Sequence, residues 1–473
     1  MQLRYKRLGK NTFLVFLGKA GSSIIGLLML PFYTHWLSTN EYGTVDLITT
    51  YSSILMGIMT CCIADSIFIF PKESDDNGKT RYFTSGLVYE VIASFCVGII
   101  FLLLQYLSDC YSLRGVFFER IWFVLAFAIC QFLQQYSQSF TQSLDKMKVF
   151  SITGILYTLA IALFSFILIP RYGLNGYLFA MIYANILATF FTVIASRSYK
   201  YLSISGYDRE HLVRLLRYGL PLIPNGLMWW LVNGLNRPVM ESSLGLDALG
   251  LYAVANKFPG LLSTMVGIFG TAWNITMLEE FGKPDFNRFF NRTVKMLFFL
   301  MIICGCVISA CSKLIVTLFA DPTYFDAWKY IPVLTLGVVF QYFSGIVGGV
   351  FMAEKKSKYF FYSSIWGAIT SLIATIICIK FWGLQGAAIA VSLSFFVMAV
   401  ARLVYAWKHI NEMRLSWYIL VTLLYIIFIV LVLADNSLLL NIPLYLVILG
   451  IVFFMSRDII APLLGMMKSR FNI

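Results

Sequence analysis

The chain has 473 residues, of which 59% are hydrophobic and only 12% are charged, and its mean hydropathy is +0.80. Soluble domains carry roughly 25% charged residues, so this composition excludes a soluble enzyme and indicates an integral membrane protein. The formal net charge of +13 would suggest nucleic-acid binding in a soluble protein. Here the basic residues are scattered over short loops, so we expect membrane lipids and no nucleic acid as partners.

The chain contains about fourteen apolar segments long enough to cross a hydrocarbon core of about 30 Å as helices. They lie near residues 11–37, 43–70, 83–107, 119–140, 149–169, 174–196, 214–236, 249–278, 293–311, 328–353, 359–379, 384–407, 415–433 and 438–456. The expected fold is therefore an all-α integral membrane protein with about fourteen transmembrane helices.

The basic residues divide unevenly between the two sides of this layout. The N-terminus and every second loop carry 27 of the 36 Lys and Arg residues, whereas the opposite loops carry seven. These seven are Arg114, Arg120, Arg171, Arg237, Lys313, Lys329 and Lys380. Because positively charged loops stay on the cytoplasmic side, both termini are predicted to be cytoplasmic.

An internal repeat relates the two halves of the chain. The stretch IPRYGLNGYLFA near residue 170 matches IKFWGLQGAAIA near residue 380 at an offset of 210, and the loop before Gly43 matches the loop before Gly250 at an offset of 207. We therefore predict two six-helix lobes in parallel repeat, 1–200 and 201–410, followed by two extra helices in 411–473. Parallel repeats are typical of transporters, with the site between the halves. Chance similarity of apolar helices is the alternative.

Two lysines, Lys19 and Lys257, lie inside apolar segments, one in each predicted lobe. A buried lysine costs about 2.5–3.5 kcal/mol on insertion scales, which favours a functional role in binding an anion. For Lys19, the alternatives are snorkelling to the interface or pairing with Asp65, which is also a candidate for ion coupling. For Lys257, the alternative is pairing with Glu241 or Asp247.

Two polar stripes run along predicted helices. Residues Gln131, Gln134, Gln135, Gln138 and Gln142 fall within an arc of about 100°. Residues Asn225, Trp229, Asn233 and Asn236 are spaced by three or four positions on the seventh segment. Amides and an aromatic ring suit sugar hydroxyls and ring faces, so both stripes are predicted to bind substrate. The alternative for both is hydrogen bonding between packed helices.

Several catalytic and cofactor signals are absent from the sequence. Gly78-Lys79-Thr80 lacks the first glycine of a P-loop, since position 73 is Glu, so no nucleotide site is expected. The three histidines lie near segment ends, and the nine cysteines show no metal or disulfide spacing. We therefore predict no catalytic residues, no metal and no cofactor.

Two stretches resemble the bacterial polysaccharide transporter family, which includes the O-antigen flippases called Wzx. One is 11–47, with its glycine-rich segment and the Glu41-Tyr42-Gly43 loop, and the other runs from Leu215 to Pro224. The GLNG and GLQG loops are also similar to this family. The family belongs to a superfamily with the lipid II flippases and the MATE exporters.

The resemblance implies flipping of an undecaprenyl-diphosphate-linked oligosaccharide from the cytoplasmic to the periplasmic leaflet of the bacterial inner membrane, by alternating access. Lipid II flippases carry cavity cations in the first and eighth helices, where Lys19 and Lys257 lie here. Association with other polysaccharide assembly proteins is a further expectation. The alternatives are a cation-coupled exporter of drugs or metabolites and, less favoured, a membrane polymerase or acyltransferase.

Overall fold

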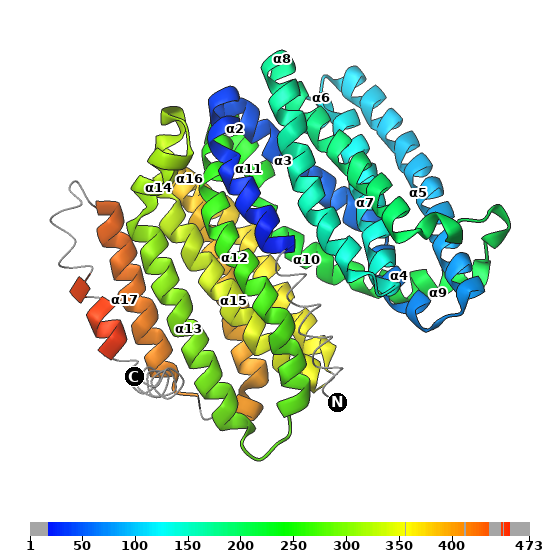
Figure 1. The fold of residues 1–473 in the computed structure, drawn as a ribbon. Helices are drawn as coiled ribbons and strands as arrows, with labels where there is room; N and C mark the ends of the chain where they lie inside the picture. The colour runs from blue at the N-terminus through cyan, green and yellow to red at the C-terminus, as the bar shows by residue number, and fades with distance from the viewer. Residues whose placement is uncertain (1–17, 355, 411–412, 435–445, 448, 455–473) are drawn as a thin grey trace, which may run out of the picture. The chain divides into compact units, whose positions relative to one another are not determined.

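A computed structural model of the chain describes residues 18–354, 356–410, 413–434, 446–447 and 449–454 (Figure 1). All regular structure in these ranges is helical. The chain forms two compact units, Met1–Ala253 and Val254–Ile473. This division follows from how the helices pack. The predicted boundary near residue 200 follows instead from the sequence similarity between the two halves, so the lobes 1–200 and 201–410 stay a prediction.

The first unit contains helical residues 18–28 and then a series of helices coloured from blue to green in Figure 1. In chain order these are α2 (Leu30–Trp36), α3 (Thr39–Met59), α4 (Ile63–Ile69), η1 (Phe70–Glu73), α5 (Asp76–Tyr111), α6 (Val116–Glu119), α7 (Ile121–Ser143), α8 (Met147–Ser196), η2 (Ser198–Tyr201), η3 (Ile204–Gly206), α9 (Arg209–Gly219), η4 (Leu220–Leu222), α10 (Ile223–Asn233) and α11 (Asn236–Leu244). Helix α7 packs on α3, α4 and α8, so it is central to this unit.

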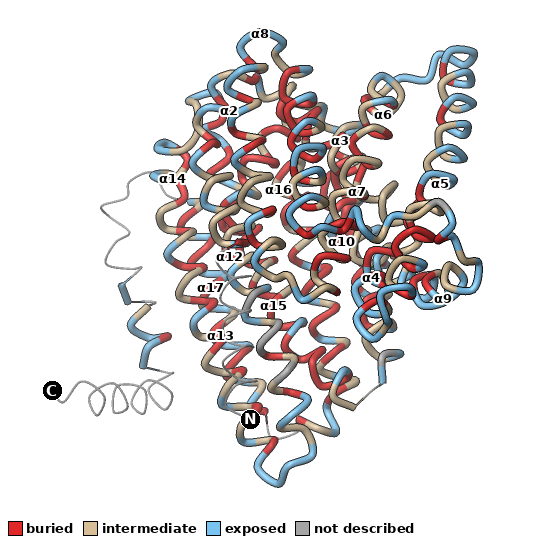
Figure 2. Tube along the Cα trace, turned by 45° about the vertical axis from the view of Figure 1, so that its right-hand side comes forward, coloured by how far each residue is buried: buried red, intermediate tan, exposed pale blue. Residues whose placement is uncertain are grey.

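The second unit follows from α12, which begins in the first unit. Its elements are α12 (Leu246–Glu280), α13 (Phe286–Ala310), α14 (Ser312–Phe319), η5 (Pro322–Lys329), α15 (Ile331–Ala353), α16 (Ser357–Ile410) and α17 (Leu415–Ala434). Helix α15 packs on α13 and α16, and 83% of its apolar span is buried (Figure 2). It is therefore the core helix of this unit.

The expected all-α membrane fold is confirmed. Six of the described helices are long and apolar enough to cross a membrane, or seven when α3 and the following segment 63–73 count as one span bent by 58°. Two of them, α8 and α16, have 50 and 54 residues, and each joins two of the expected spans across a kink. Residues 446–447 and 449–454, from the fourteenth expected segment, are helical as well.

The two kinks have the same backbone geometry. Gly173 in α8 has φ 53° and ψ −130°, and Gly383 in α16 has φ 54° and ψ −131°. A positive φ in this range is strained for residues with a Cβ, so both positions require glycine. The two glycines are 210 residues apart, which is the offset of the sequence repeat.

A second glycine follows each kink and allows a close approach of two backbone segments. A Cβ at Gly176 would clash with the carbonyl oxygen of Leu168, and a Cβ at Gly386 would clash with that of Cys378. In each case the clashing carbonyl lies eight residues earlier, on the other side of the kink. The GLNG and GLQG motifs therefore build the same turn between two spans.

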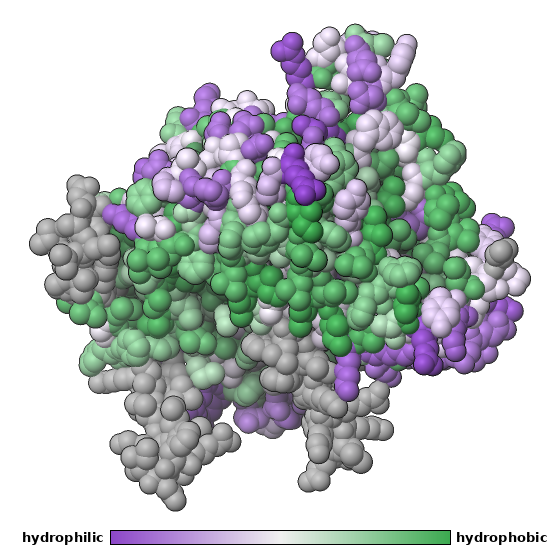
Figure 3. All heavy atoms as spheres, turned by 45° about the horizontal axis from the view of Figure 1, so that its top comes forward, coloured by the Kyte–Doolittle hydropathy of each residue, from purple (hydrophilic) through white to green (hydrophobic). Residues whose placement is uncertain are grey.

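Apolar side chains cover long stretches of the surface, as expected for helices in contact with lipid. Hydrophobic side chains occupy broad areas of the face seen in Figure 3. Only 11% of the apolar span of α5 is buried, and Val91 and Phe95 on this helix are about 70% exposed. In water this exposure would be unfavourable, so it supports a multi-pass membrane protein.

Candidate functional site

Lys19 lies on the exposed side of the first described helix. Residues 18–28 pack on the start of α8 through Gly18, which approaches the backbone of Ser151, and through Ser22, whose hydroxyl donates to Gly154 O at 2.9 Å. Lys19 itself is exposed, and no ion pair is formed by it in the part of the chain that the structure describes. The alternative pairing with Asp65 is thus not formed in this structure.

Lys257 is likewise exposed, on α12. Its neighbours Ala255 and Phe258 are buried, whereas the lysine side chain is exposed. Glu241 and Asp247, the alternative partners, accept hydrogen bonds elsewhere in the first unit, from Tyr51 and from Thr39. Within the described ranges Lys257 has no salt bridge, so it is exposed and unpaired there, as Lys19 is.

The glutamine stripe of α7 is half-buried along its whole length. Gln131, Gln134, Gln135, Gln138 and Gln142 are all of intermediate exposure, while Phe132 and Tyr136 between them belong to a buried aromatic cluster. The Oε1 atom of Gln131 is buried and has no hydrogen-bond partner among the described residues. The stripe therefore lies beside the packed face of α7, and at least one of its amide oxygens has no hydrogen-bond partner among the described residues.

The stripe on α10 is divided between different environments. Asn225 is half-buried, and its Oδ1 lacks a partner within the described chain. Trp229 is half-buried, and Asn233 is exposed but donates its amide to Trp229 O at 2.8 Å, in its own helix. Asn236 falls on α11, where it is buried and donates to Tyr252. Only 225–233 therefore forms a continuous accessible stripe.

Asp65 follows a break in the second span. Cys61 and Cys62 have positive φ values of 47° and 55°, and α4 begins directly after them. Asp65 is exposed in the first turn of α4, and the described residues include no ion pair to it. Broken membrane helices are common at substrate and ion sites of transporters, so the position of Asp65 is compatible with ion coupling.

Sequence reasoning missed a buried ion pair near the predicted outer ends of α3 and α11. Arg237 Nε lies 2.6 Å from Asp46 Oδ2, and the arginine is only 9% exposed. One helical turn further along α11, Glu241 accepts hydrogen bonds from Tyr51 at 3.1 Å and from the backbone N–H of Val116 at 2.7 Å. Arg237 had been assigned to an outer loop, but it is a buried helical residue that ties α11 to α3.

Next to this ion pair, the starts of α3 and α12 cross at two glycines. A Cβ at Gly43 would clash with Leu246 O, and a Cβ at Gly250 would clash with Thr39 O. The Thr39 hydroxyl also donates to the Asp247 carboxylate. Because no larger residue fits at either position, this crossing requires both glycines.

Arg402 was also misplaced by the charge count, which grouped it with a basic loop. It lies inside α16 with no exposed surface, and its guanidinium donates to Ser363 Oγ at 3.1 Å and Ser344 O at 2.9 Å. The guanidinium carbon lies 4.0 Å from the centroid of the Phe360 ring. Burial of an arginine without a carboxylate is uncommon and could not be inferred from the apolar sequence around it.

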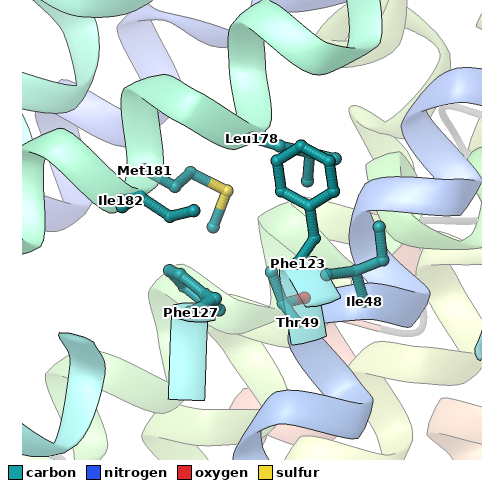
Figure 4. Close-up of a pocket in the computed structure, with 7 residues that line it drawn as sticks. All are labelled: Ile48, Thr49, Phe123, Phe127, Leu178, Met181 and Ile182. Atoms are coloured by element: carbon teal, nitrogen blue, oxygen red, sulfur yellow. The ribbon is translucent and has the colours of Figure 1, made fainter. Parts of the chain in front are cut away.

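The pocket shown in Figure 4 lies within the first unit, between α3, α7 and α8. Its lining is apolar apart from one threonine, and comprises Ile48, Thr49, Phe123, Phe127, Leu178, Met181 and Ile182. None of the predicted substrate-binding side chains is among them. This is a gap in the packing of the three helices, and its lining offers no charged group for a phosphate.

Two carboxylates outside the spans, Asp208 and Glu354, each contact more than one basic side chain. The backbone N–H of Glu210, aided by His211, lowers the pKa of Asp208, which also pairs with Arg81 at 3.0 Å. In the second unit, a hydrogen bond from Lys356 lowers the pKa of Glu354, and His409 lies 3.2 Å from the same carboxylate. Both clusters lie at helix ends, and the distribution of basic residues predicts that these ends face the cytoplasm.

Sequence comparison identifies two family profiles that match this chain. A profile described as “Polysaccharide biosynthesis protein” matches residues 8–274, and one described as “MatE” matches residues 237–377. No curated protein sequence matches the chain.

Several solved structures share the fold. “Lipid II flippase MurJ, inward closed conformation” superposes with a TM-score of 0.70 at 16% identity, covering 95% of this chain and 99% of that chain. An inward-facing multidrug resistance MATE family transporter of the MOP superfamily gives a TM-score of 0.64 at 15% identity, covering 84% and 94%. A MOP superfamily transporter from Pyrococcus furiosus gives 0.54 at 15% identity, covering 86% and 96%. Identities this low establish the fold alone.

Proposed function

Because this chain belongs to the polysaccharide biosynthesis protein family and has the fold of MOP superfamily transporters, we propose that it is a flippase for a lipid-linked oligosaccharide. Under this proposal, the substrate is an undecaprenyl-diphosphate-linked O-antigen or similar polysaccharide repeat unit. It moves from the cytoplasmic to the periplasmic leaflet of the bacterial inner membrane by alternating access, and both termini are cytoplasmic. The family match, which covers more than half of the chain, carries the proposal.

The two exposed lysines are the proposed partners of the diphosphate. Lys19 and Lys257 lie inside predicted spans, one in each compact unit, and neither has a salt bridge among the described residues. An unpaired ammonium at membrane depth is costly unless it faces water or an anion. Lysine provides a point charge without the bidentate geometry of arginine, which suits a ligand that must also be released.

The two amide stripes are the proposed contacts for the sugars. Gln131, Gln135 and Gln138 are half-buried on α7, and Asn225, Trp229 and Asn233 lie along α10. The unpartnered oxygens of Gln131 and Asn225 are buried in this conformation, and they would accept hydrogen bonds from sugar hydroxyls in a conformation that exposes them. Trp229 offers a flat apolar face for a sugar ring.

The direct test is deletion of the gene, followed by mass spectrometry of lipid-linked glycans on each side of the inner membrane. Accumulation of an undecaprenyl-diphosphate-linked repeat unit in the cytoplasmic leaflet, with loss of surface glycan, is expected. No accumulation, together with unchanged surface glycan, would remove the proposal.

The lysine roles are tested in the complemented deletion strain. Lys19→Ala and Lys257→Ala should each abolish surface glycan at unchanged protein level, and the Lys→Arg variants should retain part of the activity. Lys380→Ala, which removes an exposed lysine near the kink of α16, is the matched control and should behave as wild type. Full activity of the double alanine variant would contradict the assignment of the lysines to the diphosphate.

The glutamine stripe is tested by cysteine labelling. A water-soluble maleimide should modify cysteines at Gln131, Gln135 and Gln138 and spare cysteines at Phe132 and Leu133, which pack in the aromatic cluster. Equal labelling around α7 would show that the stripe does not face water.

A cation-coupled exporter of drugs or metabolites is the second candidate, and the MatE match over 237–377 favours it. Two exposed lysines at a binding site would repel cationic drugs, which argues against this function. If the deletion strain became sensitive to drugs and kept its surface glycan, the exporter would replace the flippase.

A further inference from the structure

The first unit buries one carboxylic acid that neither the lysines nor the amide stripes involve. Glu90 lies in the middle of α5, about 21 Å from the start of that helix at 1.5 Å per residue. It is only 1% exposed, although α5 is exposed over most of its apolar span. A carboxyl group enclosed at this depth is costly and is a functional-site candidate by default.

The surroundings of Glu90 provide a single hydrogen-bond donor. The Ser94 hydroxyl donates to Oε1 at 3.3 Å, whereas Oε2 is buried and has no partner among the described residues. No Lys, Arg or His in the described ranges forms an ion pair with this carboxyl. An ionised carboxylate has about four acceptor positions, so one weak donor leaves the charge unsatisfied.

The nearby phenols cannot supply the missing donor, because their protons are already used. Tyr136 of α7 interacts electrostatically with Glu90, but its hydroxyl donates to Phe83 O at 2.8 Å. Tyr89, beside Glu90 on α5, has its hydroxyl 3.2 Å from Met59 O and 3.0 Å from Cys61 Sγ. Both phenols are neutral hydrogen-bonding groups, so the position lacks compensating charge.

Glu90 also lies next to the break in the second span. Its neighbour Tyr89 is bonded to Met59 and Cys61, which are the residues where α3 ends and the chain turns with a positive φ. On α5, the residues one and two turns before Glu90 belong to the aromatic cluster that includes Phe83 and Tyr136. Thus the part of α5 around Glu90 connects the packed aromatic layer with the bend between α3 and α4.

We propose that Glu90 is a proton-binding site of this transporter and that proton loss from its carboxyl is coupled to the conformational change. In the conformation described here, Glu90 is the neutral acid. When the unit opens, water reaches the carboxyl, the O–H bond breaks, the proton passes to water, and the ionised carboxylate is solvated. The cost of enclosing that carboxylate again links proton binding to closure.

The protonation part of this inference is independent of the substrate, whereas its use in transport rests on the proposed function. Asp65, the coupling candidate from the sequence, lies exposed in the first turn of α4. Glu90 differs because it is enclosed, and a carboxyl group without compensating partners cannot be both ionised and buried. Its protonation state therefore depends on the conformation, which is what coupling of proton binding to movement requires.

The site itself is tested by infrared difference spectroscopy of the full-length protein in nanodiscs. A carboxylic C=O band should persist at about pH 7, where ordinary exposed glutamates are ionised. The band should disappear in Glu90→Gln, shift in Glu90→Asp, and remain in Glu119→Gln, which removes an exposed carboxyl by the same substitution. An unchanged band in folded Glu90→Gln and Glu90→Asp would refute the site.

The coupling is tested with spin labels on Thr39→Cys and Asp247→Cys, which flank the crossing of α3 and α12. This pair also removes the titratable carboxyl at that crossing. Between about pH 5 and pH 8, the ratio of the populations with short and long distances between the two labels should change at least fivefold. In the Glu90→Gln background this ratio should change less than twofold, whereas in the Glu119→Gln background it should change as much as in the labelled protein without a further substitution. A distance distribution that ignores pH, or one equally sensitive in Glu90→Gln, would overturn the coupling while leaving the glycan assays unaffected.

Discussion

Helices α8 and α16 share the backbone geometry of their kink, but a pair of equivalent buried positions carries different polar side chains. At the offset of 210, Thr153 corresponds to Ser363 and Thr192 to Arg402. In α8 the two threonine hydroxyls are 2.9 Å apart, and in α16 Arg402 Nε lies 3.1 Å from Ser363 Oγ. Both pairs join the two halves of a kinked helix at the same place, one by a neutral contact and one by a cation.

The difference is accommodated by small neighbours of the arginine. A Cβ at Gly348 of α15 would lie 3.0 Å from Arg402 Nη1 and 3.0 Å from the Phe360 ring. The guanidinium therefore fits because α15 offers a glycine there and because the ring face of Phe360 covers it. The same kinked backbone can therefore enclose either a neutral or a charged side chain, provided that the adjacent helix has a residue small enough to make room for it.

Exchanging the paired residue should produce the largest effect. Thr192→Arg places a charge in a fully buried position whose present partner is a threonine, so we expect a loss of about 4 kcal/mol or more and little folded protein. The reverse change, Arg402→Thr, leaves a cavity and should cost about 2–4 kcal/mol. Size-exclusion profiles and Tm in detergent measure both. If Thr192→Arg were as stable as wild type, α8 would accommodate a buried arginine as well as α16 does, and the proposed difference between the two sites would be wrong.

The shared turn should be sensitive in both helices. Gly176→Ala and Gly386→Ala each force a Cβ against a backbone carbonyl, and we expect losses of about 3 kcal/mol from overpacking. Gly98→Ala in α5, where no atom lies within 4 Å of the added Cβ, is the control and should leave Tm unchanged. A marked loss for only one of the two turns would break the equivalence of α8 and α16.

The space around Arg402 gives a smaller effect. Gly348→Ala must displace the guanidinium or the Phe360 ring by a few tenths of an ångström, which should cost about 1–2 kcal/mol. Gly345→Ala lies one turn earlier on α15, meets no atom within 4 Å and serves as the matched control. Equal Tm values for the two variants would show that Arg402 has room to spare.

The carboxylates outside the spans should give the smallest effect. The pKa values of Asp208 and Glu354 are lowered in the folded protein, so the stability they contribute is present above their unfolded pKa values of about 3.9 and 4.3 and is lost as pH falls further. Asp208→Asn and Glu354→Gln should therefore reduce the fall of Tm in acid, by no more than about 2 °C each. A steeper fall in either variant would contradict this sign.

The helices and the two turns were predictable because their signals are local. Apolar length identifies spans, and the GLNG and GLQG loops contain the glycines that a positive φ and a close backbone approach require. The charge count failed at Arg237 and Arg402, since basic residues near segment ends were assigned to loops. Their partners are Asp46, 191 residues away, and Ser344 and Ser363, so their burial depends on tertiary packing.

The candidate site was predictable only as a set of polar positions in apolar segments. Lys19 and Lys257 are exposed as a binding role requires, but their contact with substrate stays a prediction. Glu90 was overlooked because it stands alone in the segment 83–107, without a polar stripe. Its lack of hydrogen-bond donors depends on the tertiary contacts of Ser94, Tyr89 and Tyr136, which the sequence does not reveal.

The crossing of α3 and α12 has a consequence for the ancestry of the chain. Gly43 contacts Leu246 and Gly250 contacts Thr39, and these four residues exchange places under the offset of 207. Reciprocal contacts of this kind characterise a homodimer with twofold symmetry, in which one patch meets its own copy. The crossing is therefore what a duplicated and fused half-length ancestor would leave behind. Because a Cβ at either glycine would clash with a backbone carbonyl, a change of the opposite glycine cannot compensate, and both halves must keep their glycine.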